Sequence, residues 1–200
     1  MPRNRPIEPL VGVVDWKTVF DGNIWRVQQT LHTSGRTFEK AVRSPGSRLI
    51  VTTNGQILLS REKRREHGGI VDYRLPGGKV FDTSEEYVAF LATGQNIVDM
   101  SRLSVAREGL EEVGLKIDPT TLTYLGVDVL GATCEWDLHY WLCEEFLEAE
   151  GGAQHQESEA DEIEGSVWVT FEEARKLALD PRQFSESRSA RMLLSYVAKL

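Results

Sequence analysis

The chain is poor in several features, and each shortage excludes a class of protein. Its 200 residues contain only two cysteines, Cys134 and Cys143, too few for a disulfide framework or a zinc site of the usual spacing. No apolar run approaches the roughly 18 residues that a membrane-spanning helix needs. The N-terminal stretch MPRNRPIEPL has arginines but no following apolar run, unlike a signal peptide. We therefore expect a soluble, cytoplasmic protein that makes no membrane contact.

Positive charge is also scarce. The chain has 23 lysines and arginines against 31 acidic residues, giving a net charge of −8. Binding to a nucleic acid polymer needs clustered basic residues, so we expect no such partner. A small phosphate-bearing ligand needs only a local positive site and stays compatible with this balance. The Gly77-Gly78-Lys79 stretch lacks the rest of a P-loop, and the four histidines have no metal-ligand spacing.

The pattern of apolar and turn residues predicts one α/β domain, rich in strands at first and helical later. Asn54-Gly55 between two apolar runs is a strong hairpin signal. Thr170 and Glu173 form a capping-box pattern, and Gly114 suits the end of a helix. We expect strands at 10–15, 24–31, 37–43, 48–53, 56–60, 70–75, 121–130, 136–147 and 166–170, and helices at 85–93, 97–113, 171–178 and 186–198.

The most informative feature is the acidic end of the helix predicted over 97–113. Glu108, Glu111 and Glu112 stand at i, i+3 and i+4, so they share one helical face. Like charges at this spacing repel, whereas a hard divalent cation such as Mg²⁺ would turn the repulsion into binding. The alternative is an ordinary solvated acidic face on a surface helix.

Two segments resemble the signature of the Nudix hydrolases: LPGGKV at 75–80 and AREGLEEVGL at 106–115. The second matches the family pattern except that Gly109 stands where an apolar residue is usual, which weakens a helix by up to about 1 kcal/mol. Relative to the pattern, about 15 residues within roughly 81–98 are inserted, where extra chain costs little closure entropy.

The resemblance implies an α/β/α sandwich with a mixed central sheet, plus N-terminal antiparallel strands. It also implies hydrolysis of a pyrophosphate bond with Mg²⁺ or Mn²⁺ as cofactor. The metal ligands would be the Gly78 carbonyl, Glu108, Glu111 and Glu112. Arg107 would hold the carboxylates in place, and Glu111 and Glu112 are catalytic candidates. A general base would come from the acidic loop before the last strand, where Glu159 is favoured and Glu157, Asp161 and Glu162 remain open.

The N-terminal layout is similar to the ADP-ribose pyrophosphatase branch, in which extra N-terminal strands build a homodimer and help enclose the adenosine. By this resemblance, residues 1–44 form a strand extension that dimerises, and residues 45–200 form the hydrolase domain. The expected substrate is ADP-ribose or a similar nucleotide sugar. Substrate-binding candidates are Arg43, Arg61, Arg65 and Gly131, although surface arginines often have no such role.

Two alternatives remain at this point. One is a hydrolase of damaged or surplus nucleoside triphosphates, with the same chemistry and a different pocket. Leu130-Gly131, where the ADP-ribose branch usually has Pro-Gly, keeps this possibility open. The other is a non-catalytic ligand sensor with the same fold. A sensor predicts the loss of a signature glutamate, and all three are present.

Overall fold

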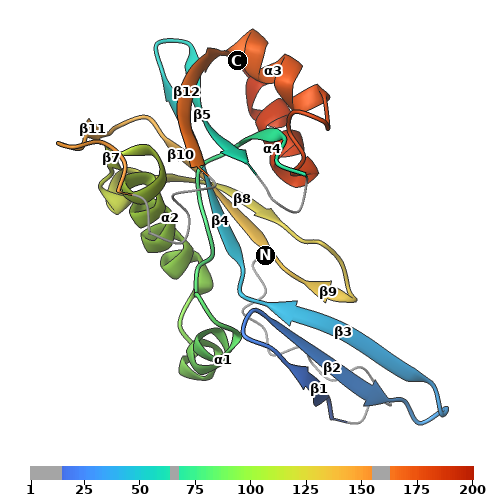
Figure 1. The fold of residues 1–200 in the computed structure, drawn as a ribbon. Coiled ribbons are helices and arrows are strands. Elements are labelled where there is room, and N and C mark those ends of the chain that lie inside the picture. The colour runs from blue at the N-terminus through green and yellow to red at the C-terminus, as the bar shows by residue number, and fades with distance from the viewer. Residues whose placement is uncertain (1–14, 64–67, 155–162) are drawn as a thin grey trace. The chain divides into compact units, whose positions relative to one another are not determined.

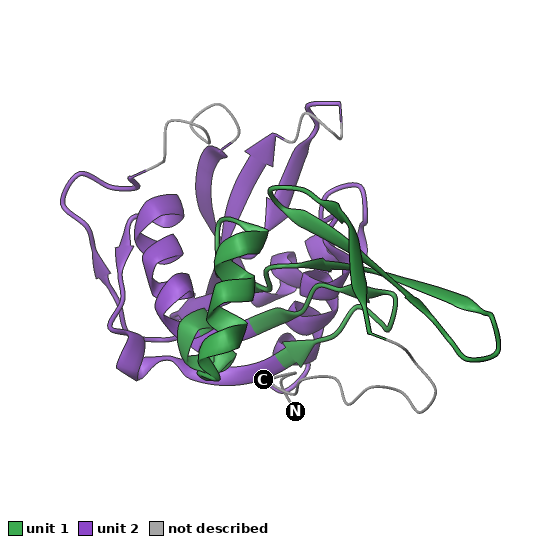
Figure 2. Ribbon diagram, turned by 90° about the horizontal axis from the view of Figure 1, so that it is seen from below, with its two compact units in different colours: residues 1–46, 79–101, 127–139 green, residues 47–78, 102–126, 140–200 purple. Residues whose placement is uncertain are grey.

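The computed structural model describes residues 15–63, 68–154 and 163–200. The chain divides into two compact units, coloured separately in Figure 2, and each is described by itself. None of the helices within the described ranges is long and apolar enough to cross a membrane. The first unit comprises residues 1–46, 79–101 and 127–139, and the second comprises residues 47–78, 102–126 and 140–200.

An N-terminal sheet forms much of the first unit. The hairpin predicted from 24–31 and 37–43 is confirmed, with Leu31 opposite Thr37 at its closed end. The strand expected at 10–15 lies almost wholly outside the described residues. A strand that was not predicted pairs with the hairpin instead; all its residues are exposed, so it shows no alternation of buried and exposed positions. The strand order is β1 (Lys17–Asp21), β2 (Trp25–Leu31), β3 (Thr37–Arg43) and β9 (Cys134–Glu135), the last parallel to β3.

The inserted segment builds a small core of its own within the first unit. It contains helix α1 (Ser84–Thr93), which begins at the N-cap Thr83 and ends at the left-handed Gly94. Val80, Phe90 and Ile97 form its buried cluster, with partly buried aromatic residues packed against it. The backbone N–H and hydroxyl of Ser84 donate to Asn23 O and Gly22 O, both at 2.8 Å. The insertion is therefore anchored to the turn between β1 and β2.

A six-stranded sheet forms the centre of the second unit, with helix α2 on one side and α3 and α4 on the other (Figure 1). Its Asn54-Gly55 hairpin is confirmed, because both residues have positive φ and Thr53 pairs with Gln56. Apolar side chains of the two hairpin strands, such as Leu49 and Leu59, are fully buried. The order is β12 (Ile163–Thr170), β5 (Gln56–Lys63), β4 (Gly46–Thr53), β10 (Leu138–Cys143) and β8 (Thr123–Asp128), with β6 (Val71–Arg74) paired to β5.

The strand expected over 136–147 is wrong in its length. β10 ends at Cys143, whose thiol donates to Glu145 O at 3.4 Å. The chain then leaves the sheet, because β11 (Leu147–Glu148) pairs with β7 (Leu115–Lys116) in a separate two-stranded sheet. The sequence does not reveal this exit, since both pieces look extended.

The helices agree closely with the predicted ranges. Gly114 follows α2 with a φ of 68°, as a C-terminal glycine should. The Thr170–Glu173 capping box is complete, with reciprocal side-chain and backbone hydrogen bonds. A short 3₁₀ helix, η2 (Pro119–Thr121), was not predicted. Besides α1, the α-helices are α2 (Ile97–Val113), α3 (Phe171–Leu179) and α4 (Ser187–Val197).

Gly109, the departure from the Nudix pattern, lies at a close contact of α2 with its neighbours. A Cβ at this position would come 2.7 Å from Ile117 Cδ1 and 3.3 Å from Leu49 Cδ1. The Ile117 side chain occupies the space that a side chain at position 109 would need. The lack of a side chain at Gly109 therefore makes room for the side chain of Ile117.

Candidate active site

The glycine loop that ends β6 is held against strand β4 by its backbone. Pro76 O accepts from Leu49 N at 2.8 Å, and Gly78 O accepts from Ser47 N at 2.9 Å. Between them Gly77 has a φ of 138°, and a Cβ there would lie 2.2 Å from Ser47 O. Only glycine tolerates that conformation and that approach, so the sequence Pro-Gly-Gly is required by the backbone path.

Two signature glutamates of α2 point at this loop. Glu112 accepts a hydrogen bond from Gly77 N–H at 2.7 Å through its Oε2 atom. A Cβ at Gly78 would lie 2.6 Å from the carboxyl carbon of Glu108, so the missing side chain makes room for that carboxylate. Both glutamates are buried, and Glu111 is half-buried. The predicted acidic helix face is therefore not an ordinary solvated surface.

The electrostatics of Glu112 reflect a gathering of like charges. Burial raises its pKa well above the usual value, and the charges of Glu62 and Glu108 raise it further. The Gly77 N–H and the cation of Arg48 oppose this shift. Glu62 was not predicted as part of the site. The one sequence feature that could have indicated it is a glutamate within the largely apolar strand β5. Buried carboxylates are rare unless they have a partner or a function.

The donor set suits a divalent cation. Two buried carboxylates that repel each other, next to a glycine carbonyl, are oxygen ligands of the kind Mg²⁺ prefers. Gly78 O accepts from Ser47 N at 2.9 Å and makes a longer contact, 3.4 Å, with Arg48 Nη1. Within the described part of the chain, no group of three or more His, Cys, Asp or Glu side chains is arranged to hold a metal by itself. Mg²⁺ commonly takes few protein ligands and fills its shell with water and substrate phosphates, so the two observations agree.

The arginine of the signature pairs with its neighbour. Arg107 Nη2 lies 3.2 Å from Glu108 Oε1, while the Arg107 side chain is 43 % exposed and that of Glu108 only 9 %. Such an exposed cation contributes little to stability but limits the positions that the carboxylate can adopt. That Arg107 holds the carboxylates in place stays a prediction.

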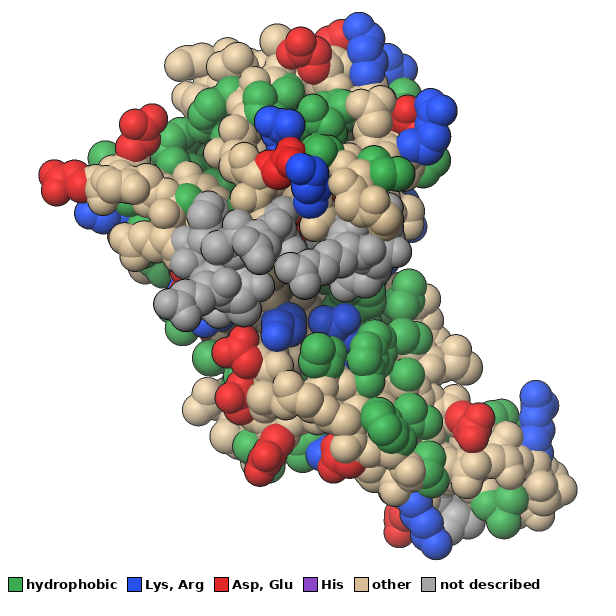
Figure 3. All heavy atoms as spheres, in the orientation of Figure 1, with side chains coloured by type: hydrophobic (Ala, Val, Ile, Leu, Met, Phe, Trp, Pro, Cys, Tyr) green, Lys and Arg blue, Asp and Glu red, His purple; other side chains and the backbone are tan. Residues whose placement is uncertain are grey.

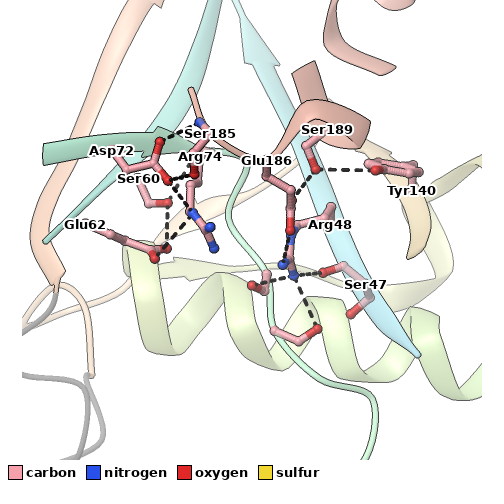
Figure 4. A network of polar contacts seen from close by, with 12 residues as sticks. Ser47, Arg48, Ser60, Glu62, Asp72, Arg74, Tyr140, Ser185, Glu186 and Ser189 are labelled. Atoms are coloured by element: carbon pink, nitrogen blue, oxygen red, sulfur yellow. Dashed lines mark hydrogen bonds and ion pairs between the residues drawn. The ribbon is translucent and has the colours of Figure 1, made fainter. Parts of the chain in front are cut away.

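A buried polar network lies behind the loop (Figure 4). Arg48 donates to both carboxylate oxygens of Glu186, each at 2.9 Å, and its Nη1 donates to Gly77 O at 2.8 Å. The Arg48 guanidinium is therefore fully engaged by partners inside the protein. A second set of contacts joins Arg74 to Asp72 at 2.8 Å and to Glu62 at 3.7 Å.

The predicted substrate-binding residues lie in different places. In the second unit, Arg61 Nη2 pairs with Glu164 Oε2 at 3.3 Å. In the first unit, the Arg43 guanidinium stacks on Trp25 and Trp136, at 5.0 and 4.4 Å from the ring centroids. Gly131, also in the first unit, has a φ of 150°. Arg65 and the base candidates Glu157, Glu159, Asp161 and Glu162 lie outside the described residues.

The chain matches a family model described as the NUDIX domain over residues 43–188. No curated protein matches the chain. The fold is similar to many solved structures, including the next three. A structure titled an ADP compounds hydrolase has a TM-score of 0.65 at 15 % identity, covering 94 % of this chain and 91 % of that one.

The other two resemble a smaller part of the chain. The ORF135 protein of E. coli has a TM-score of 0.51 at 20 % identity, covering 77 % of this chain and 88 % of that one. A NUDIX hydrolase from Nitrosomonas europaea has a TM-score of 0.53 at 15 % identity, covering 78 % of this chain and 89 % of that one. At these identities the likeness concerns the fold.

Proposed function

The chain belongs to the Nudix family of pyrophosphohydrolases, and we propose that it hydrolyses the pyrophosphate bond of a nucleoside diphosphate linked to another moiety. ADP-ribose or a similar nucleotide sugar is the favoured substrate. The observation that carries this proposal is the approach of Glu108 and Glu112 to the Gly77-Gly78 loop, which gathers buried carboxylates around a glycine carbonyl.

The proposed cofactor is Mg²⁺ or Mn²⁺. When bound, such an ion neutralises phosphate charge and lowers the pKa of a bound water. Glu108, Glu112 and the Gly78 carbonyl would hold it, with Glu111 next to them on the helix. The Gly77 N–H orients the Glu112 carboxylate, and Arg107 restrains that of Glu108. These contacts keep the carboxylates in position before substrate arrives.

The general base is assigned to the acidic loop before β12, with Glu159 first and Asp161 and Glu162 after it. A carboxylate acting as base must accept the proton of the attacking water, so Gln in its place should abolish that step. Comparing Glu159→Gln with Glu157→Gln, Asp161→Asn and Glu162→Gln tests the assignment, because only the base should lose turnover while binding the metal normally.

The substrate preference is supported by the extent of the structural likeness. The ADP compounds hydrolase covers 94 % of this chain, whereas the ORF135 protein and the Nitrosomonas enzyme cover less than four-fifths. The N-terminal strands lie ahead of the NUDIX match at residue 43, so the fuller coverage includes part of them. Arg61, Arg65, Arg43 and Gly131 are the proposed substrate contacts, the arginines through hydrogen bonds to a diphosphate.

A homodimer built through the N-terminal strands belongs to the same proposal. Val19 and Phe20 on the edge strand β1, and Leu31 at the end of β2, are each more than half exposed. Figure 3 shows hydrophobic side chains at the surface of this region. Exposed apolar side chains on an edge strand are a frequent site of association. This surface would be covered by a second copy of the chain.

The deciding experiment measures product release from ADP-ribose, nucleotide sugars, NADH, dinucleoside polyphosphates and the dNTPs, with and without Mg²⁺. Metal-dependent cleavage of ADP-ribose to AMP supports the proposal. A preference for a triphosphate would favour a house-cleaning pyrophosphohydrolase. Metal binding without turnover of any compound would favour a ligand sensor.

A further inference from the structure

The contacts of Arg48 reach both the glycine loop and the start of α4. Its Nε and Nη2 atoms form a two-pronged bond to Glu186 Oε2 and Oε1 at 2.9 Å each. Its Nη1 donates to Gly77 O at 2.8 Å and to Ser47 O at 3.0 Å, and lies 3.4 Å from Gly78 O. Both side chains are at most 9 % exposed. One buried guanidinium thus links two segments that are far apart in sequence.

Glu186 is fully committed to this arrangement. It stands at the N-cap of α4, yet its side chain makes no cap hydrogen bond. Its carboxylate instead accepts from Arg48 and from the hydroxyl of Ser189, which is in turn 3.3 Å from the Tyr140 hydroxyl. Figure 4 shows this chain of contacts running from Tyr140 to the loop. The Glu186 side chain therefore orients Arg48 and does not cap α4.

The pair is ionised throughout the physiological range. Burial alone would raise the pKa of Glu186, but the charge and hydrogen bonds of Arg48 lower it to about 2. Burial lowers the pKa of the Arg48 guanidinium, but the charge and hydrogen bonds of Glu186 raise it more. The pKa of Arg48 therefore lies above its usual value. An ion pair this deep is often no more stabilising than apolar side chains of similar size. The role of this pair is therefore sought in the geometry that it imposes on the glycine loop.

That effect is on Gly77. The N–H of Gly77 donates to Glu112, and its carbonyl accepts from Arg48. The peptide groups on both sides of Gly77 are thus fixed, at a glycine that could otherwise adopt many other orientations. Rotation of the first peptide would turn the Gly77 N–H away from Glu112. Rotation of the second would break the bond between Arg48 and Gly77 O and change the backbone path into Gly78, whose carbonyl oxygen lies 3.4 Å from the same Arg48 Nη1 atom.

We propose that Arg48 and Glu186 are positioning residues, which fix the Gly77-Gly78 peptides so that Glu112 and the Gly78 carbonyl are aligned for a divalent cation. This inference rests on the proposed function for the identity of the ligand. Neither residue needs to touch the substrate. Contacts behind the direct ligands commonly change metal affinity by about 10- to 100-fold.

The test is Mn²⁺ binding, measured by electron paramagnetic resonance of the free ion on folded protein without substrate. The key variant is Arg48→Met/Glu186→Leu, which removes both charges together and avoids leaving one unpaired in the interior. Thermal unfolding checks that it folds. We expect Mn²⁺ affinity to fall by about 10- to 100-fold. Glu186→Gln is the second variant, and it should weaken Mn²⁺ binding in the same direction while keeping the side-chain shape.

The matched control is Lys40→Met/Glu135→Gln. It removes another largely buried ion pair, with a 3.0 Å contact, that belongs to the first unit. Its Mn²⁺ affinity should equal that of the unmodified protein. Glu112→Gln defines the background from weak binding elsewhere on this acidic chain.

The outcomes separate the inference from the proposed function. Weaker Mn²⁺ binding by a folded Arg48→Met/Glu186→Leu variant, with the control unchanged, supports the positioning role. Unchanged Mn²⁺ affinity in that variant overturns it. If the unmodified protein binds Mn²⁺ but hydrolyses no diphosphate, the proposed function fails while the binding comparison still decides the inference. In an active enzyme, the Mg²⁺ concentration for half-maximal rate should rise more than kcat falls.

Discussion

The backbone N–H of Gly77 donates to the carboxylate of Glu112 across 2.7 Å, although 35 residues separate them in sequence. This bond joins the glycine loop to the acidic helix, the two halves of the Nudix signature. In sequence, residues 79–101, which include the insertion, lie between the glycine loop and the acidic end of α2. The insertion therefore leaves the two halves in contact.

Replacing Glu112 by Gln should separate activity from stability. The variant loses an anionic ligand, so we expect metal-dependent turnover to fall by about 100-fold or more. Its melting temperature should stay the same or rise, because the buried charge of Glu112 is disfavoured by Glu62 and Glu108. Turnover assays and thermal unfolding measure the two effects. Glu172→Gln, at an exposed glutamate of α3, is the control and should change neither.

Substituting Gly77 should be far more harmful than substituting another glycine with positive φ. In Gly77→Ala the new Cβ would meet Ser47 O at 2.2 Å, so we expect a loss of about 3 kcal/mol or more. Gly55→Ala is the matched control, since Gly55 also has positive φ but no atom within 4 Å of the added Cβ. It should cost only about 1 kcal/mol. Similar losses in urea unfolding would contradict the close approach described here.

The contact between Gly109 and Ile117 predicts that a substitution at one position should compensate for a substitution at the other. Gly109→Leu restores the apolar residue usual in the family, but it should destabilise the protein by about 1–3 kcal/mol because Ile117 occupies the space. Adding Ile117→Ala should recover much of this loss, although Ile117→Ala alone leaves a cavity. A double-mutant cycle by chemical denaturation measures the coupling. Additive effects of the two substitutions would show that they do not share this space.

Stability should fall as the pH is lowered from about 6.5 to about 4, partly because of His139. Burial lowers the pKa of this histidine to about 4. The unfolded chain therefore binds a proton near pH 6.5, the folded chain does so only near pH 4, and protonation between these values favours unfolding. Between pH 7 and pH 5 the contribution is about 2 kcal/mol. His139→Gln should flatten the pH dependence by that amount in urea unfolding; an unchanged slope would assign it to other groups.

The N-terminal strands should set the oligomeric state. Phe20→Lys places a charge at a side chain that is 56 % exposed, so it should leave the fold intact and weaken a homodimer. Light scattering coupled to size exclusion measures the mass. Leu179→Lys on α3, at a side chain that is 60 % exposed, is the control and should leave the mass unchanged. A monomeric unmodified protein would remove the dimer from the proposal.

The sequence by itself determined the local elements and the chemistry of the acidic helix. The bounds of α2, the Asn54-Gly55 hairpin and the Thr170 capping box depend on periodicity and on short-range bonds, and all are confirmed. Glu108 and Glu112 were singled out because their spacing on one helical face is a local property. The exit of the chain after Cys143 was missed because it depends on pairing with a distant strand.

Only the tertiary structure decided which groups surround those glutamates. Glu62, Arg48 and Glu186 come from a strand, another strand and a helix cap, and no spacing in the sequence relates them. Arg48 looked like any other arginine until its burial and its bond to Glu186 showed that it is occupied within the protein. The reason is physical: a desolvated charge takes its partner from whatever the fold brings within about 3 Å, and that proximity is not encoded at any fixed separation along the chain.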